Sequence, residues 1–175
     1  MAARALLETG HAYRAVVEAR KAGTTTTTTT TAAERLGRQT FGYVLVALVS
    51  NLERTFTISP ASRPLGRELF LVHFGDVGAE RTMEIMMAAY DEGKHVGKRW
   101  TVGNSAQGET GGGEEDGVGY DQVEEVKVTV LEEDPRWRKV CVDGAIVELE
   151  RGGWMAVKKA PRALFNVLVD RSVLP

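Results

Sequence analysis

The chain has 175 residues, of which 43% are hydrophobic and 26% charged, so it can bury one core and is expected to form a single domain. Its net charge of −2 and its pI of about 6.0 lack the basic excess of nucleic-acid-binding domains, so no nucleic-acid partner is expected. The longest apolar run, residues 44–49, is too short to cross a bilayer, and no signal-peptide pattern is present. We therefore expect a cytoplasmic protein whose membrane contact, if any, is peripheral.

The single cysteine, Cys141, excludes a disulfide within the chain. It lies in the apolar run Val140-Cys141-Val142, which predicts a small core or near-core hydrophobic residue rather than a reactive thiol.

A separate N-terminal helix is expected in the first segment, residues 1–23. Ala, Leu, Glu and Arg dominate there, and the larger apolar side chains fall near helical spacing over residues 2–22. An unbroken run of threonines follows at 24–31, with no hydrophobic period. It predicts a low-complexity linker over residues 24–40.

The main domain is expected over residues 41–160 and begins with strands. An apolar, β-branched run at 43–49 and alternation at 54–58 predict two of them. Residues 68–74 alternate two apolar sets, which indicates a central strand covered on both faces.

A helix is predicted over residues 79–92, ending at Gly93. One apolar stripe recurs at i, i+3, i+4 and i+7, formed by Met83, Met86, Met87 and Tyr90. This stripe is either ordinary core packing or, because methionine is adaptable, the lining of a pocket for lipid chains.

The last third alternates turns and short strands. Residues 102–119 are rich in Gly, Glu and Ser and predict a flexible insertion. Strands are expected near 126–130, 138–142, 146–149 and 154–158, with a hairpin turn at Asp143-Gly144 and a C-terminal tail over 161–175. The whole pattern favours an α+β fold: an antiparallel β-sandwich with one inserted amphipathic helix.

Conventional catalytic motifs are weak in this sequence. Gly111-Gly112-Gly113 lacks the flanking strand and helix that a phosphate-binding loop needs, and Gly75-Asp76-Val77-Gly78 has only two glycines. The three histidines have no acid or cysteine at metal-ligand spacing, so no metal site is predicted. The residue patterns alone therefore predict a β-rich domain with one helix, and they do not indicate a function.

Three blocks in a fixed order carry a resemblance. The first runs from residue 43 through Phe56-Thr-Ile-Ser-Pro-Ala-Ser-Arg-Pro-Leu-Gly66 to residue 74. The second is the helix that ends in Gly93-Lys94-His95, and the third joins residues 126–131 to Val140-Cys-Val-Asp-Gly144. Together they resemble the C-terminal domain of sphingosine kinases, ceramide kinases and bacterial-type diacylglycerol kinases, and most of all a fungal sphingosine-kinase-like protein.

The resemblance implies that two domains bind the two substrates, ATP and lipid. In that family ATP, with Mg²⁺, is held mostly by an N-terminal domain with a G-G-D-G element, which nothing in this sequence matches. The C-terminal β-sandwich encloses the lipid and turns a D-G-E motif toward the nucleotide. By resemblance, Asp143 and Gly144 would line the ATP side, and Met83, Met86, Met87 and Tyr90 would line the lipid pocket.

Two departures from the family pattern matter. The family glutamate, thought to act as a base for the lipid hydroxyl, is Ala145 here, so no catalytic residue is assigned. Glu148 lies three residues further along a strand and should face the other side. Leu65 stands where diacylglycerol-kinase relatives often carry an acid that helps bind Mg²⁺.

Three functions follow as expectations. The first is the lipid-binding part of an ATP-dependent kinase for a sphingoid base or diacylglycerol, whose partners are the lipid, the membrane surface and the missing N-terminal kinase domain. The second is a catalytically inactive lipid-binding or regulatory module of the same family. The third is an unrelated β-sandwich interaction domain. In each case the isolated chain is expected to be inactive as a kinase.

Overall fold

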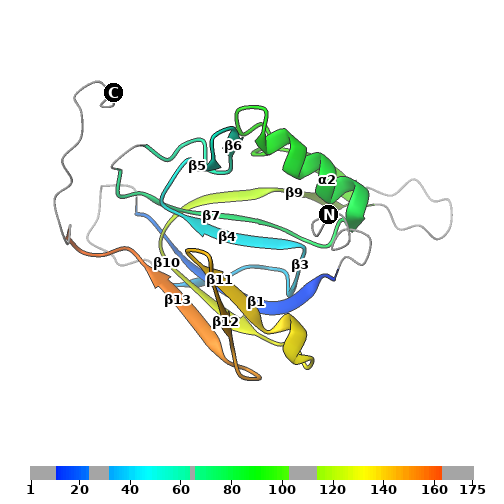
Figure 1. The fold of residues 1–175 in the computed structure, drawn as a ribbon, viewed down its shortest axis with the longest axis vertical. Coiled ribbons are helices and arrows are strands. Elements are labelled where there is room, and N and C mark those ends of the chain that lie inside the picture. Colours follow the sequence, from blue (N-terminus) through cyan, green and yellow to red (C-terminus); the bar gives the residue numbers. More distant parts are fainter. Residues whose placement is uncertain (1–10, 24–31, 64–65, 103–113, 163–175) are drawn as a thin grey trace, which may run out of the picture.

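The computed structural model describes residues 11–23, 32–63, 66–102 and 114–162. Within these ranges the protein consists mainly of antiparallel strands with a single α-helix (Figure 1). The predicted α+β class is confirmed at this level. No helix among the described residues is long and apolar enough to cross a membrane.

The main sheet has the strand order β2-β1-β10-β7-β4, and two further strands join it, with β3 pairing with β1 and β13 with β10. Its members in chain order are β1 (Tyr13–Lys21), β2 (Glu34–Arg35), β3 (Thr40–Phe41), β4 (Tyr43–Ala47), β7 (Leu69–Phe74), β10 (Gly119–Val130) and β13 (Trp154–Lys158).

Strand β10 connects two parts of this sheet. Its first half, 119–123, pairs with β7, and its second half, 125–129, pairs with β13. Strand β1 lies along the opposite edge of β10, from Val123 to Val130. Strands β7 and β13 therefore pair with successive parts of the same edge of β10. The two strands point away from each other where they leave β10, as Figure 1 shows.

Three two-stranded hairpins surround the sheet. They are β5 (Asn51–Glu53) with β6 (Phe56–Thr57), β8 (Arg99–Val102) with β9 (Glu114–Gly117), and β11 (Lys139–Val142) with β12 (Ala145–Glu148). Helix α2 (Gly78–Ala89) follows β7, and a short 3-10 helix, η1 (Pro135–Trp137), precedes β11. The helix, the central strand and the Asp-Gly hairpin are thus confirmed as predicted.

The prediction of an N-terminal helix is wrong for residues 13–21, which form β1. Ala15, Val17 and Ala19 are buried at alternate positions, so the period is two rather than 3.6. Pairing with β10 along its length outweighs the helix propensity of the alanines and arginines. Residues 1–10, the rest of the predicted helix, lie outside the described residues.

Strands also occur in segments predicted to be irregular. Glu34–Arg35 and Thr40 of the expected linker pair with β1, as does Phe41 at the start of the expected main domain. Residues 114–117 of the expected flexible insertion form β9, and β10 begins at Gly119. The polar composition of both segments gave no sign of this pairing, whose partner strands lie across an intervening connection. The threonine run, residues 103–113 and the tail from 163 fall outside the described residues.

Two apolar clusters cover the two faces of β7. Leu69 and Leu71 belong to a cluster shared with β1, β3 and β10. Val72 and Phe74 belong to a second cluster, which helix α2 closes through Ile85. All six residues of β7 are buried, which confirms the prediction of a central strand covered on both sides.

A pH effect on stability is expected from His73, which is buried in β7. Burial, followed by the nearby Arg38 guanidinium, lowers the pKa of His73 from 6.5 to about 4. Between these values the unfolded chain binds a proton that the folded protein does not. The free energy of unfolding should therefore decrease as the pH falls from 6.5 to 4, and be unaffected by this group at higher pH. Urea denaturation at several pH values should show that the free energy of unfolding falls less steeply with pH in His73→Gln than in the unmodified protein. The same pH dependence in both proteins would contradict this role of His73.

Candidate functional site

The predicted nucleotide-facing turn lies between β11 and β12. Asp143 and Gly144 have φ of 47° and 87°, the left-handed conformation required at both centres of a type I′ turn. Val142 pairs directly with Ala145 across the turn. The two residues that the resemblance singles out thus form a tight hairpin tip.

Strand register decides which side chains share a face of this hairpin. Ala145 faces the same side as Val142 and Val147, since Val147 is two residues further along β12. Glu148 faces the opposite side, as the sequence predicted. Glu148 cannot substitute for a carboxylate at position 145.

The β11–β12 hairpin exposes apolar side chains on both of its faces. Ile146 is 66% exposed, Val142 44% and Val147 43%, and their neighbour Cys141 is also exposed. The prediction of a core-like Cys141 is therefore wrong, because among the described strands β11 pairs with β12 alone and not with the main sheet. An isolated two-stranded hairpin is marginally stable, and exposed apolar patches indicate interaction surfaces.

Helix α2 divides the predicted methionine stripe. Its buried residues are Ile85 and Ala89, and Met86 packs against the same cluster as Ile85. Met83, Met87 and Tyr90 are 42–56% exposed. The buried face is thus offset by one to two residues from the predicted stripe. The i, i+4 spacing of Ile85 and Ala89 was the signal that sequence analysis missed.

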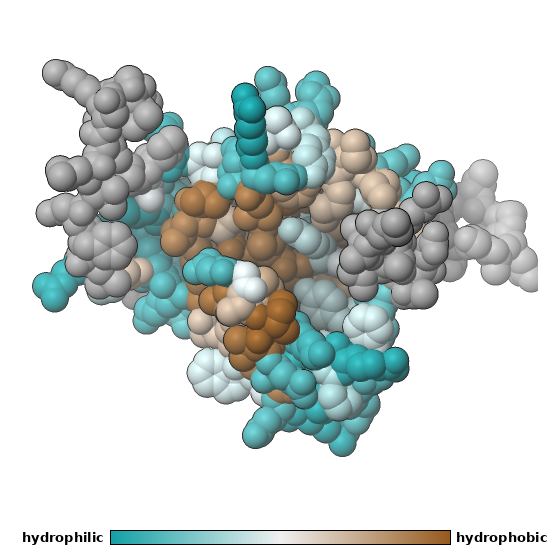
Figure 2. All heavy atoms as spheres, in the orientation of Figure 1, coloured by the Kyte–Doolittle hydropathy of each residue, from teal (hydrophilic) through white to brown (hydrophobic). Residues whose placement is uncertain are grey.

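Tyr90 joins this helix to the β5–β6 hairpin. Its hydroxyl donates a hydrogen bond to Glu53 Oε1, and its ring lies 4.8 Å from that of Phe56 in an edge-to-face arrangement. Leu48, Val49 and Leu52, in and before β5, are about half exposed. Figure 2 shows hydrophobic side chains gathered on this face, over β4, near the β5–β6 hairpin and over β11–β12.

The Gly-Lys-His block has a structural role. Gly93 has φ of 78°, and an added Cβ would lie 3.0 Å from Pro60. His95 is fully buried, with its Nε2 3.1 Å from the carbonyl oxygen of Ile58. The block therefore fixes the chain after α2 against residues 58–60.

Replacing Gly93 with alanine should destabilise the fold. The substitution combines a left-handed backbone conformation with a tight contact to the Pro60 ring, and each should cost on the order of 1 kcal/mol or more. Thermal unfolding should show a lower Tm than for the control Gly37→Ala, whose Cβ would meet no atom within 4 Å. Equal Tm values would contradict the structural role.

Two cavities occur among the described residues, and neither is an enclosed apolar pocket. One, of about 680 Å³, is lined by four basic side chains, Glu124, Ala160 and Pro161. Another, of about 160 Å³, lies beside α2 and is lined mainly by charged residues with Ile85 and Trp100. Neither of these two cavities therefore encloses an apolar surface for a lipid chain.

Comparison with known proteins gives no assignment, since no model of a known protein family matches the chain and no curated protein matches it significantly.

Proposed function

We propose that this chain is the C-terminal, lipid-substrate-binding part of an ATP-dependent lipid kinase that phosphorylates a sphingoid base or a diacylglycerol. The supporting observation is the apolar β11–β12 hairpin, which is exposed on both faces and ends in the Asp143-Gly144 turn. In the lipid kinases that the sequence resembles, the corresponding turn lies between the lipid and the nucleotide. Exposed apolar surface beside such a turn is what a lipid and a second domain would cover.

The divided sheet supports the β-sandwich that the resemblance implies. The branch containing β4 and β7 and the branch containing β13, β1 and β2 would be its two layers, joined through β10. The core cluster shared by β1, β7 and β10 would fill the space between them.

Roles for the named residues follow from this arrangement. Asp143 and Gly144 would face ATP and Mg²⁺ held by a nucleotide-binding domain that supplies the G-G-D-G element. Met83, Met87 and Tyr90 would contact the acyl or sphingoid chain, whereas Met86 would support them from the core. The complete enzyme would act in the cytoplasm at a membrane surface, where its lipid substrates reside.

Lipid binding is the direct test of this proposal. Met87→Ser and Ile146→Ser should each weaken binding of fluorescent sphingosine about ten- to a hundredfold, because each removes a side chain whose burial contributes about 1.5–3 kcal/mol. Both residues are exposed, so the fold should persist. Trp154→Ser is the matched control, since Trp154 is 59% exposed and lies on β13 rather than on α2 or the hairpin. Failure of the unmodified chain to bind any sphingoid base or diacylglycerol would contradict the proposal.

A second candidate is a catalytically inactive lipid-binding or regulatory module of the same family. Ala145 favours it, because alanine cannot accept a proton from the lipid hydroxyl. Lipid binding by the isolated chain without nucleotide binding would select this candidate. Micromolar ATP binding by the isolated chain would contradict it.

A further inference from the structure

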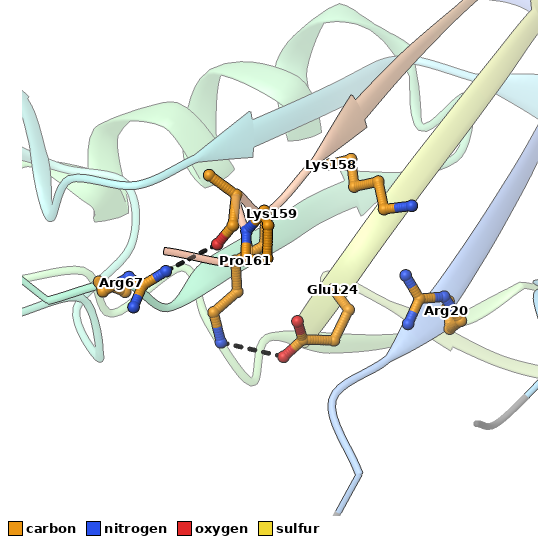
Figure 3. A pocket seen from close by; sticks show the side chains of 7 residues that line it. Arg20, Arg67, Glu124, Lys158, Lys159 and Pro161 are labelled. Carbon is orange, nitrogen blue, oxygen red and sulfur yellow. Dashed lines mark hydrogen bonds and ion pairs between the residues drawn. The ribbon is translucent and has the colours of Figure 1, made fainter. Parts of the chain in front are cut away.

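A basic cavity lies where the end of β13 meets the segment before β7. It has a volume of about 680 Å³, in the range of small-molecule sites, and Figure 3 shows its lining side chains. They come from β1, from the segment before β7, from β10 and from the end of β13: Arg20, Arg67, Glu124, Lys158, Lys159, Ala160 and Pro161.

The charges in this cavity do not balance. Lys159 Nζ is 3.0 Å from Glu124 Oε1, which accounts for one pair. Arg20 and Lys158 share a single carboxylate, Glu125, at 3.1 and 3.8 Å. Two cations facing one carboxylate leave one positive charge unmatched.

Arg67 supplies the second unmatched charge. Its Nη2 donates to the carbonyl oxygen of Ala160 at 2.7 Å, and no carboxylate partner of Arg67 is found among the described residues. The neutral carbonyl orients the guanidinium and leaves its other N–H groups available for a bidentate contact with two oxygens of an anion. The cluster therefore carries a net charge of +2 in a protein whose overall charge is −2.

We propose that this cavity, with Arg20, Arg67 and Lys158 in its lining, binds a phosphate group. A phosphate monoester carries a charge of about −1.5 to −2 at neutral pH, which matches the excess. In Figure 3, Arg67 and Lys159 lie on one side of Glu124 and Arg20 and Lys158 on the other. This site goes beyond the proposed lipid-kinase function and does not depend on it.

The test uses the full chain and two probes, inorganic phosphate and phosphatidylcholine vesicles containing phosphatidic acid. Arg67→Gln with Lys158→Gln should weaken binding about tenfold or more, because two charge-assisted contacts are lost. The control, Lys94→Gln with Arg151→Gln, removes the same charge from exposed positions outside the cavity and should bind like the unmodified chain. Binding of free phosphate would indicate a soluble phosphate compound, and binding of the vesicles alone would indicate a lipid headgroup.

A second measurement needs no substitution. Acylation of Lys158 and Lys159 by an N-hydroxysuccinimide ester, followed by mass spectrometry, should slow several-fold in the presence of the bound probe, whereas acylation of Lys94 should not. The proposal would be overturned if the probe left the acylation rates of Lys158 and Lys159 unchanged or slowed Lys94 equally. It would also be overturned if the two double variants lost the same binding affinity, or if neither probe bound the unmodified chain.

Discussion

Under the proposed lipid-kinase function, Ala145→Glu is expected to raise the rate of sphingosine phosphorylation about 10²- to 10⁴-fold when this chain is combined with the nucleotide-binding domain of a sphingosine kinase. The residue begins β12 directly after the Asp143-Gly144 turn and is exposed, so a glutamate fits without disturbing the core. A carboxylate there would accept the proton of the lipid hydroxyl as the phosphoryl group is transferred. The increase should appear in kcat with little change in the KM for lipid, because the new group acts in the transition state.

Two matched variants separate this effect from added charge. Val147→Glu places a carboxylate on the same face of β12, two residues from the turn, and should give no increase. Glu148→Gln removes the carboxylate on the opposite face and should leave the activity unchanged. If Ala145→Glu binds lipid and ATP but gains no activity, the family's role for this position does not apply to this chain.

Phe74→Ala is expected to lower the free energy of unfolding by about 3–5 kcal/mol, the usual cost of truncating a buried aromatic residue. Phe74 is 1% exposed, stacks on Tyr43 at 5.5 Å and belongs to the cluster that α2 covers. Its loss would leave a cavity beneath the helix that carries Met83, Met87 and Tyr90.

The comparison variant is Trp154→Ala, which truncates a larger aromatic side chain that is 59% exposed. Its ring lies 5.2 Å from Lys127 Nζ, a contact of about 0.5–1 kcal/mol at an exposed site. Urea denaturation should therefore separate the two variants clearly. Similar losses in both would mean that Phe74 is not a core residue.

The C-terminal strands illustrate how far local patterns determine the site. Alternation at 126–130 predicted a strand that is part of β10, and Asp143-Gly144 predicted the β11–β12 turn, because only residues that tolerate positive φ form such a turn. The apolar double pattern of residues 69–74 likewise predicted that both faces of β7 are covered. In each segment the information is local, since a strand's alternation or a turn's conformation depends on adjacent residues.

The tertiary structure decided what local patterns could not. Residues 13–21 carry helix-forming residues, yet they pair with β10, more than 100 residues later in the chain. Cys141 lies in an apolar strand, yet it is exposed because that strand, within the described part of the chain, pairs with β12 alone. The basic cavity joins side chains from β1, β10 and β13 and from the segment before β7. Burial and charge clustering depend on which distant segments meet, so sequence patterns identified the elements, and long-range pairing determined the surfaces available for binding.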